Sequence, residues 1–305
     1  VLLDEGISDI KTYVEEVSAT ASGEKQIEDK LREIEAHWEE QEFDVKRYRD
    51  YKDRYILGSL EDIIAILEDD QVSIQTMIGL KYAAGIRGEI ETWEKTLSNV
   101  ADVIDEWINC QKQWMYLENI FSAADIQRQL PAESQKFTQV DKFWKDTMHK
   151  SNKNSRVKDC CAMDNILHKF VQANKTLDNI QKHLEDYLET KRSAFPRFYF
   201  LSNDELLEIL SQTRNPHSVQ AHLRKCFDNI ARIGFTPVEK STEIVNMVSG
   251  EGETVDFSES VFAEGNVEFW LSKIEKAMRG CLYDKTKEAF EAYPENGLEL
   301  ADWLF

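Results

Sequence analysis

Few residues in this sequence have the types and the spacing that chemistry requires. The nearest approach to a phosphate-binding loop is Gly250-Glu251-Gly252. A P-loop needs the spacing Gly-x-x-x-x-Gly-Lys-Ser/Thr, which occurs nowhere in the sequence, and this glycine pair lacks both the third glycine and the following helix of a dinucleotide-binding loop. The pair therefore predicts a turn, and we expect no cofactor in this chain.

Patterns for metal binding and nucleophilic catalysis are absent as well. The sequence contains no His-Glu-x-x-His, no Gly-x-Ser-x-Gly and no Glu-x-x-His, the spacing of a di-iron helical bundle. We therefore expect no catalytic and no metal-binding residues. The five cysteines form no Cys-x-x-Cys pair, which favours small buried thiols in a reducing compartment. The enzyme alternative is a helical-bundle enzyme that uses scattered carboxylates.

The charge balance limits the partners that the chain can have. Its 57 Asp and Glu residues outnumber 37 Lys and Arg residues, for a net charge of -20. This charge disfavours nucleic acid, whose phosphates need clustered cations, and it disfavours anionic membranes. No stretch approaches the ~18 apolar residues of a membrane span. The N-terminus has neither an initiator Met nor the basic start of a signal peptide, so we expect a fragment.

The elements that would position a site are mostly helices, because the chain has only 12 Gly and 5 Pro. The strongest pattern is an apolar a/d seam that predicts one helix over 86–121, with Gln111 as its one polar position. A second seam covers 166–187. Further helices are predicted at 27–38, 60–67, 72–83, 131–149 and 266–290. Together these segments predict an antiparallel helical bundle.

Other segments predict connections and a small sheet. The basic run Lys150–Lys158 predicts an exposed loop, with docking to an acidic surface as a second interpretation. Ser202 and Glu205 have the spacing of a helix capping box, and Asn215-Pro216 caps the next short helix, with Pro216 at its first position. Strands are predicted at 230–235, 242–248 and 253–257, with a further short strand at 261–262.

Three blocks carry a resemblance to a known family. The run Gln113–Phe137 includes Gln-Trp-Met-Tyr-Leu-Glu-Asn-Ile-Phe and Leu-Pro-Ala-Glu. Phe195–Gln212 begins Phe-Pro-Arg-Phe-Tyr-Phe-Leu-Ser-Asn-Asp, and Met247–Val255 reads Met-Val-Ser-Gly-Glu-Gly-Glu-Thr-Val. In this order they resemble the linker region of dynein heavy chains, over roughly residues 25 to 295. Tyr48–Leu57 and Phe198–Asn203 look most like axonemal dyneins.

The resemblance implies a fold and a mechanical role. The fold would be mainly α: an elongated multi-helix bundle rod with a small inserted antiparallel sheet. Residues 1–158 would form its N-terminal helical part and residues 159–305 its C-terminal helical part, with the sheet inserted at about 230–263. In this family the linker is a lever that switches between bent and straight states over an AAA+ ring to produce the power stroke.

The resemblance also implies partners and a location. The direct partner would be the AAA+ ring of the same heavy chain, with other dynein subunits and microtubules as indirect partners. The location would be the cytoplasmic cytoskeleton, in the axoneme of a cilium or flagellum. The first AAA+ module follows the linker in this family, so ATPase activity would belong to the parent motor and the linker itself would not be an enzyme. The alternative is a static helical scaffold of a cytoskeletal assembly.

Two sets of residues would carry the mechanical role. Three seam tryptophans, Trp93, Trp107 and Trp114, would form a stiff lever core. The hinge would lie in 195–215, where one long helix ends and short capped helices begin. Its packing residues would be Phe195, Pro196, Arg197, Phe198, Tyr199 and Phe200. The alternative is that this aromatic cluster only plugs a junction between helices.

Overall fold

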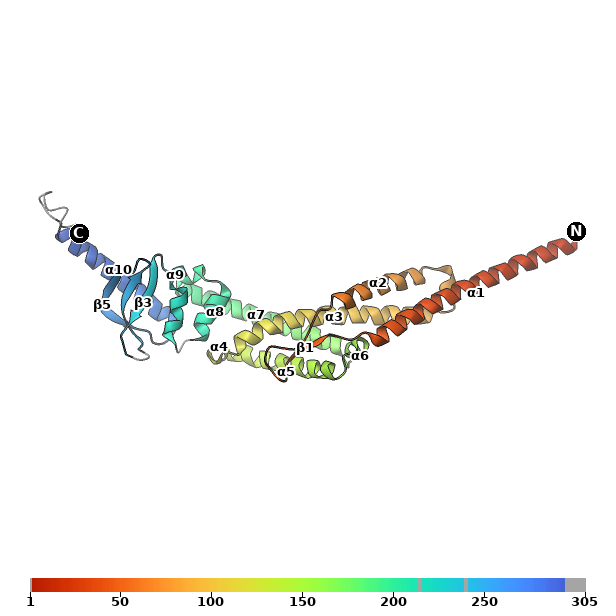
Figure 1. Ribbon diagram of the computed structural model, residues 1–305, viewed down its shortest axis with the longest axis horizontal. Helices are drawn as coiled ribbons and strands as arrows, with labels where there is room; N and C mark the ends of the chain where they lie inside the picture. The colour runs from red at the N-terminus through yellow and green to blue at the C-terminus, as the bar shows by residue number, and fades with distance from the viewer. Residues whose placement is uncertain (1, 213–214, 239–240, 294–305) are drawn as a thin grey trace. The chain divides into compact units, whose positions relative to one another are not determined.

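The chain is mainly α-helical, with two small antiparallel sheets, as the sequence predicts (Figure 1). The computed structural model describes residues 2–212, 215–238 and 241–293. The α-helices are α1 (Leu2–Glu40), α2 (Glu61–Ile78), α3 (Arg87–Phe121), α4 (Ala124–Gln129), α5 (Pro131–Lys153), α6 (Val157–Cys161), α7 (Ile166–Ala194), α8 (Asn203–Ser211), α9 (Leu223–Cys226) and α10 (Val267–Glu291). The 3-10 helices are η1 (Lys81–Ala83), η2 (Pro196–Phe200) and η3 (Pro216–His222).

The chain forms two compact units. The first contains residues 1–118 and 135–179, and the second contains residues 119–134 and 180–305. Residues 158 and 159, between which the sequence analysis divides the chain, both lie in the first unit. That division, and the elongated shape expected of the bundle, stay predictions.

The first unit is organised around buried aromatic side chains. The rings of Trp114 and Trp144 are stacked with centroids 5.1 Å apart, and the rings of Trp107 and Phe170 are 4.8 Å apart. Phe43 meets Trp107 edge-on at 5.4 Å. These contacts join α3 to α5, to α7 and to the segment after α1. Figure 1 shows α2 beside the start of α3, where Gln75 Nε2 donates to Glu94 Oε1 at 2.6 Å.

The predicted seam of α3 is buried along most of its length. The seam residues that are at most 2% exposed are Ile90, Leu97, Val100, Ile104, Trp107 and Trp114. The helix begins at Arg87, one residue later than the seam predicts, and Ile86 before it is half-buried. Trp93 is also half-buried, so Ile86 and Trp93 are less buried than the other apolar residues of the seam.

Three details of the first unit correct the sequence analysis. The two helices predicted at 60–67 and 72–83 are largely one, α2, followed by the short η1. The basic run predicted as a loop is partly helical, because α5 extends to Lys153 and α6 begins at Val157, and both Ser151 and Val157 are buried. A hairpin of β1 (Val45–Arg47) and β2 (Tyr55–Leu57) was not predicted.

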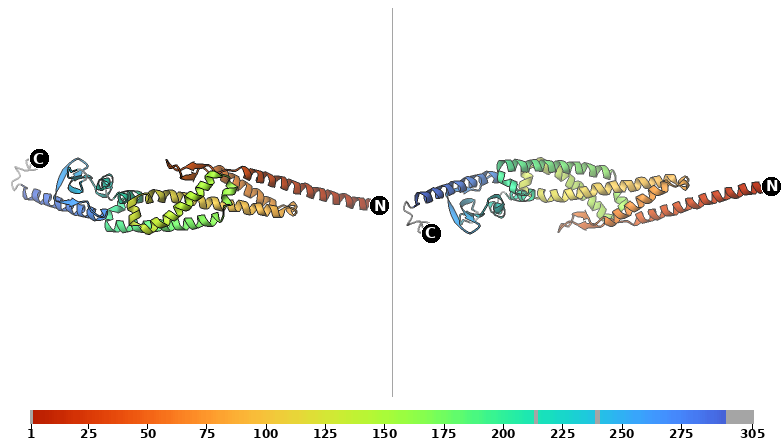
Figure 2. Two further views of the ribbon diagram at one scale, coloured as in Figure 1. Left: turned by 90° about the horizontal axis from the view of Figure 1, so that it is seen from below. Right: turned by 90° about the horizontal axis from the view of Figure 1, so that it is seen from above.

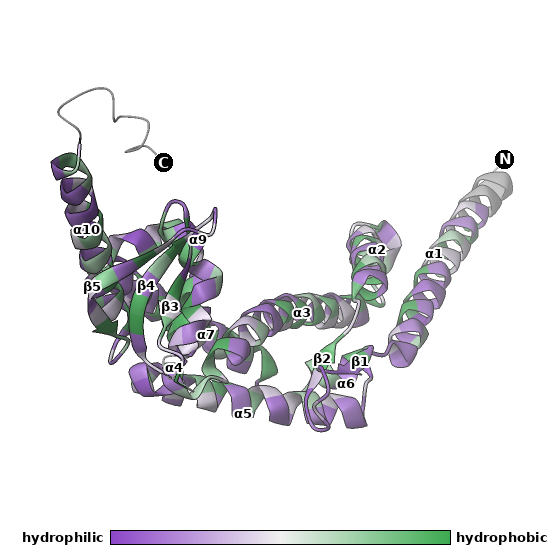
Figure 3. Ribbon diagram, turned by 60° about the vertical axis from the view of Figure 1, so that its left-hand side comes forward, coloured by the Kyte–Doolittle hydropathy of each residue, from purple (hydrophilic) through white to green (hydrophobic). Residues whose placement is uncertain are grey.

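The second unit contains a three-stranded antiparallel sheet in the order β3 (Ile230–Phe235), β4 (Glu243–Ser249) and β5 (Thr254–Phe262). The short strand predicted at 261–262 is the end of β5. Helix α10 lies along the sheet (Figure 2), and Cys281 Sγ contacts the carbonyl oxygen of Asp256 at 3.0 Å. Figure 3 shows hydrophobic stretches on β3 and β4. Ile233 of β3 and Met247 of β4 are buried.

Local signals act as predicted at the start of α8, and at the start of η3 for Pro216, whereas the Asn215 side chain forms no cap hydrogen bond with the described residues. Ser202 Oγ accepts from the Glu205 backbone N–H, and the Glu205 side chain accepts from the Ser202 backbone N–H, so both halves of the capping box are present. Pro216 occupies the first turn of η3, where its missing N–H costs no hydrogen bond. The hydrogen bonds between Ser202 and Glu205 therefore fix the residue at which α8 begins.

Candidate functional site

The predicted hinge segment begins directly after α7 with a buried aromatic pair. Phe195 and Phe198 are at most 1% exposed, and their rings meet edge-on with centroids 5.0 Å apart. A third ring, Phe227 after α9, lies 6.2 Å from Phe195. The 3-10 turn η2 brings residues 195 and 198 to the same side. The sequence analysis missed Phe227, because nothing local relates it to a segment about thirty residues earlier.

Arg197 connects this cluster to the rest of the second unit. Its Nη1 donates to the carbonyl oxygen of Cys226 at 3.0 Å, and its Nε lies 3.3 Å from Glu275 Oε1. The guanidinium also lies over the Phe227 ring, 4.8 Å from the ring centroid. A planar guanidinium can form hydrogen bonds at its edge and stack on an aromatic face at once. Arg197 therefore links η2 to the end of α9 and to α10.

The other three predicted hinge residues do not join the buried pair. Tyr199 is 56% exposed, Phe200 is 68% exposed and Pro196 is also exposed. The Tyr199 hydroxyl donates to Glu189 on α7. The six residues are thus divided between two sets. The first is the buried Phe195 and Phe198 with the half-buried Arg197, which contacts α9 and α10, and the second faces solvent. Whether any of them forms a hinge stays a prediction.

A buried ion pair lies next to this segment. Lys191 Nζ on α7 and Glu268 Oε1 in the first turn of α10 are 2.6 Å apart, and both side chains are at most 10% exposed. The Lys191 ammonium lies 5.3 Å from the centroid of the Tyr187 ring, and the Tyr187 hydroxyl donates to Gln129 on α4. Burial, and secondarily the negative charge of Glu268, raises the pKa of Tyr187. This polar cluster joins three helices of the second unit.

The three tryptophans predicted as a lever core have different environments. Trp107 and Trp114 have no exposed surface, whereas Trp93 is half-buried with the Lys158 ammonium 5.3 Å from its ring centroid. The lever core predicted from the sequence did not include Trp38 and Trp144, which are at most 1% exposed. Trp38 follows Ile27, Leu31 and Ile34 at helical spacing in the helix predicted at 27–38, so its burial could be expected from the sequence.

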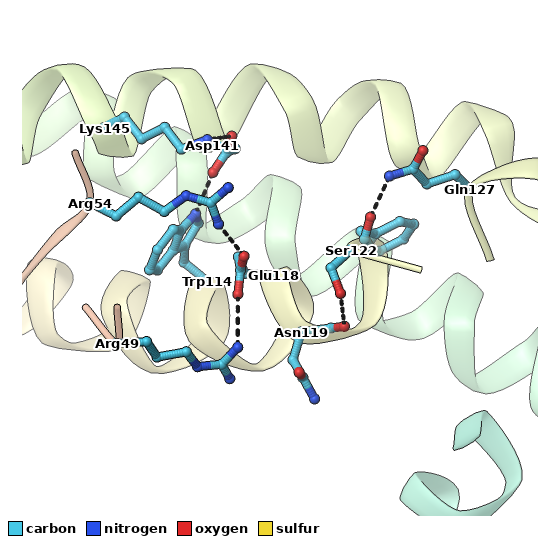
Figure 4. A network of polar contacts seen from close by, with 10 residues as sticks. Arg49, Arg54, Trp114, Glu118, Asn119, Ser122, Gln127, Asp141 and Lys145 are labelled. Carbon is cyan, nitrogen blue, oxygen red and sulfur yellow. Dashed lines mark hydrogen bonds and ion pairs between the residues drawn. The ribbon is translucent and has the colours of Figure 1, made fainter. Parts of the chain in front are cut away.

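A polar network surrounds Trp114 (Figure 4). Its Nε1 donates to Asp141 Oδ1 at 3.1 Å, and Asp141 also pairs with Lys145. One turn along α3, the carboxylate of Glu118 is 5% exposed and accepts from Arg54, and Arg49 Nη1 lies 3.7 Å from its second oxygen. Two arginines of the β1–β2 hairpin thus point inward to one buried carboxylate. The network anchors the hairpin to α3.

The described residues offer little reactive chemistry. In residues 2–212, 215–238 and 241–293, no group of three or more His, Cys, Asp or Glu side chains could hold a metal ion. Burial raises the pKa of the Cys110 thiol to about 12 and that of Cys226 to about 11, which disfavours the reactive thiolate. None of the described helices is both long and apolar enough to span a bilayer. The residues brought together here form packing and ion-pair clusters.

Comparison with known proteins assigns the family. The sequence profile "Dynein heavy chain, N-terminal region 2" matches residues 1–289. Dynein axonemal heavy chain 6 of Homo sapiens is 42% identical over 314 residues, covering 98% of this chain and 8% of the relative. Dynein axonemal heavy chain 1 of Rattus norvegicus is 42% identical over 292 residues (96% and 6%), and dynein axonemal heavy chain 2 of Homo sapiens is 44% identical over 272 residues (88% and 6%).

The chain therefore spans less than a tenth of the length of these relatives. The match nevertheless covers nearly all of this chain, including the blocks at 113–137, 195–212 and 247–255. From the profile match and these identities, the chain belongs to the dynein heavy chain family and corresponds to its N-terminal region 2.

Proposed function

We propose that this segment is the mechanical linker of a dynein-type microtubule motor, a lever that bends and straightens over an AAA+ ring to produce the power stroke. The observation that carries the proposal is the match to a dynein heavy chain region over residues 1–289, together with axonemal relatives. Its direct partner would be the AAA+ ring of the same heavy chain, and other subunits and microtubules would be indirect partners. The motor would act in the axoneme of a cilium or flagellum.

The packing of the first unit supports a load-bearing role. The completely buried Trp107, Trp114 and Trp144 contact rings on neighbouring elements. Close-packed interiors have low compressibility and transmit displacement. The segment itself would be non-catalytic, since its sequence has no P-loop. ATP hydrolysis by the isolated chain would contradict that part of the proposal.

The hinge of the lever would involve the buried Phe195–Phe198 pair and Arg197, which contact α9, α10 and Phe227. Inverting a two-state bend from about 1:99 to about 99:1 requires a differential binding energy of about 5.5 kcal/mol. Repacking of buried rings is the means by which this cluster would favour one state. The alternative role for the same contacts is a fixed plug between helices.

The test uses a whole heavy chain with fluorophores on the linker and on the ring, and follows the ATP-driven change in energy transfer. We expect Phe198→Ala to reduce the amplitude or rate of this change and Tyr199→Ala to have a smaller effect, because Phe198 is buried and Tyr199 is exposed. Phe257→Ala is the control, since it removes a buried ring of β5 that belongs neither to the hinge segment nor to the lever core. Equal effects of Phe198→Ala and Phe257→Ala would reject the hinge. Absence of any ATP-driven change in the unmodified motor would favour a static scaffold.

A further inference from the structure

Two segments of this acidic chain are locally basic. Residues 45–57, which form the β1–β2 hairpin, contain five Lys or Arg and two Asp. Residues 149–158, at the end of α5 and the start of α6, contain four Lys or Arg and no Asp or Glu. The whole chain has a net charge of -20, so both segments differ strongly from their surroundings.

The fold brings these two segments together within the first unit. The Phe43 backbone N–H donates to the Ser155 carbonyl oxygen at 2.7 Å, and the Val157 N–H donates to the Gln41 carbonyl oxygen at 2.9 Å. The rings of Tyr55 and His149 lie 6.4 Å apart. The residues directly before the hairpin therefore pair with the α5–α6 connection, and Tyr55 of the hairpin contacts His149, although about a hundred residues separate the two segments in the sequence.

Some cations of these two segments form ion pairs with carboxylates of the chain, and the others are exposed to solvent. Arg49 and Arg54 face Glu118, as Figure 4 shows, while Lys46 pairs with Asp44 and Lys158 with Glu39. The remaining cations are exposed and have no ion pair with a carboxylate among the described residues. We call these five the basic face: Arg47, Lys52, Lys150, Lys153 and Arg156.

A contribution to helix stability accounts for the presence of only two of the five cations of the basic face. Lys150 and Lys153 lie in the last turn of α5, where cations are favoured by the negative end of the helix dipole. Arg47, Lys52 and Arg156 lie outside α-helices and gain nothing from such a dipole. Their charges have no carboxylate partner in the part of the chain that the structure describes, and Arg49 and Arg54 hold the hairpin on which Arg47 and Lys52 lie.

We propose that the basic face docks an acidic segment of a partner protein, a run rich in Asp and Glu. The range of electrostatic attraction favours such a partner. At physiological ionic strength the Debye length is about 8 Å, so a short acidic segment senses mainly the local cations. A long nucleic acid or an anionic membrane would also meet the surrounding surface of this strongly acidic chain and be repelled.

The test measures binding of a fluorescent oligo-glutamate peptide to the 305-residue chain by anisotropy. We expect binding that weakens with added salt and that falls about tenfold or more in the double variant Arg47→Glu, Lys52→Glu. Lys150→Glu with Lys153→Glu should act in the same direction. The matched control is Lys182→Glu with Lys276→Glu, which makes the same charge change at exposed lysines of the second unit and should leave binding unchanged.

Circular dichroism shows whether the charge-reversal variant still folds. If it does not, the neutral variant Arg47→Gln, Lys52→Gln replaces it in the test. The neutral variant should weaken binding less than the reversal does. The proposal is overturned if the unmodified chain does not bind the peptide, or if the control weakens binding as much as the reversal. It is also overturned by tighter binding of a single-stranded oligonucleotide or anionic vesicles, or by a dimer of this chain that the reversal dissociates.

Discussion

The side-chain amide of Gln111 pairs with both backbone groups of Leu57. The Leu57 N–H donates to Gln111 Oε1 at 2.8 Å, and Gln111 Nε2 donates to the Leu57 carbonyl oxygen at 2.9 Å. A side chain of α3 thus forms the two backbone hydrogen bonds at the end of β2 that a neighbouring strand would otherwise form. Gln220 makes the same paired contact with Ile233 in the second unit. The single polar position in the α3 seam therefore has a structural purpose.

Replacing Gln111 should loosen β2 from α3. Because Leu57 is buried, Gln111→Ala leaves a backbone donor and an acceptor without partners, and we expect a loss of about 1–3 kcal/mol. The Leu57 amide should then exchange its hydrogen faster, as measured by hydrogen–deuterium exchange. Gln172→Ala, at an exposed position of α7, is the control. Unchanged protection of Leu57 would show that the paired contact does not hold the strand.

Truncating the buried tryptophans should affect stability according to their burial. Trp107→Ala or Trp114→Ala should cost about 3–5 kcal/mol, because each removes a completely buried ring. Trp93→Ala should cost less, about 1–2 kcal/mol, since part of its surface is already in water. Urea unfolding followed by circular dichroism measures the difference. Equal losses for Trp93 and Trp107 would contradict the core described for the first unit.

Removing Arg54 should destabilise the hairpin far more than removing Arg49. Arg54 is the closer partner of the buried Glu118, so Arg54→Ala leaves a carboxylate uncompensated, at a cost of about 3–5 kcal/mol. Arg49 is about half exposed and 3.7 Å from the same carboxylate, so Arg49→Ala should cost about 0–1 kcal/mol. The double variant Arg54→Met, Glu118→Leu should recover most of the loss. In the double-mutant cycle with the single variants Arg54→Met and Glu118→Leu, measured by urea unfolding, additive losses would show that the two side chains do not interact.

The buried thiols should make the fold sensitive to alkaline pH. Burial raises the pKa of Cys110 from 9.0 to about 12. A folded pKa above the unfolded value gives stability that is complete below about pH 9 and falls as pH rises toward the folded value, because the unfolded thiol ionises first. We expect the free energy of unfolding to decrease over this range, and the decrease to be smaller in Cys110→Ala. Identical pH profiles for the two proteins would contradict this assignment.

The sequence predicted elements whose cause is local. The α3 seam, the Ser202 capping box and the strands of the second unit depend on residue spacing within a few turns, and the structure confirms them. The β1–β2 hairpin escaped prediction because each strand has three residues and the connection between them is highly charged. Its contacts are with distant residues: Arg54 pairs with Glu118, and the Tyr48 ring lies 5.2 Å from the Trp114 ring, each partner more than sixty positions away.

The candidate site shows the same limit. Neighbouring residues 195–200 looked like one aromatic cluster, yet the 3-10 turn separates buried from exposed rings. The partners that complete the buried set, Phe227 and Glu275, come from remote parts of the chain. Periodicity identifies which side chains lie on one face of a helix, but it does not identify which distant element covers that face.

The Lys191–Glu268 ion pair joins two points that lie 77 residues apart in the chain. The intervening residues include η2, α8 and the whole β3–β4–β5 sheet. Because Lys191 and Glu268 meet at one buried point, the chain segment between them is closed at its base by this ion pair. If the proposed hinge at 195–215 moved α10 away from α7, this ion pair would have to separate first. Its separation would therefore add an energy barrier to such a movement.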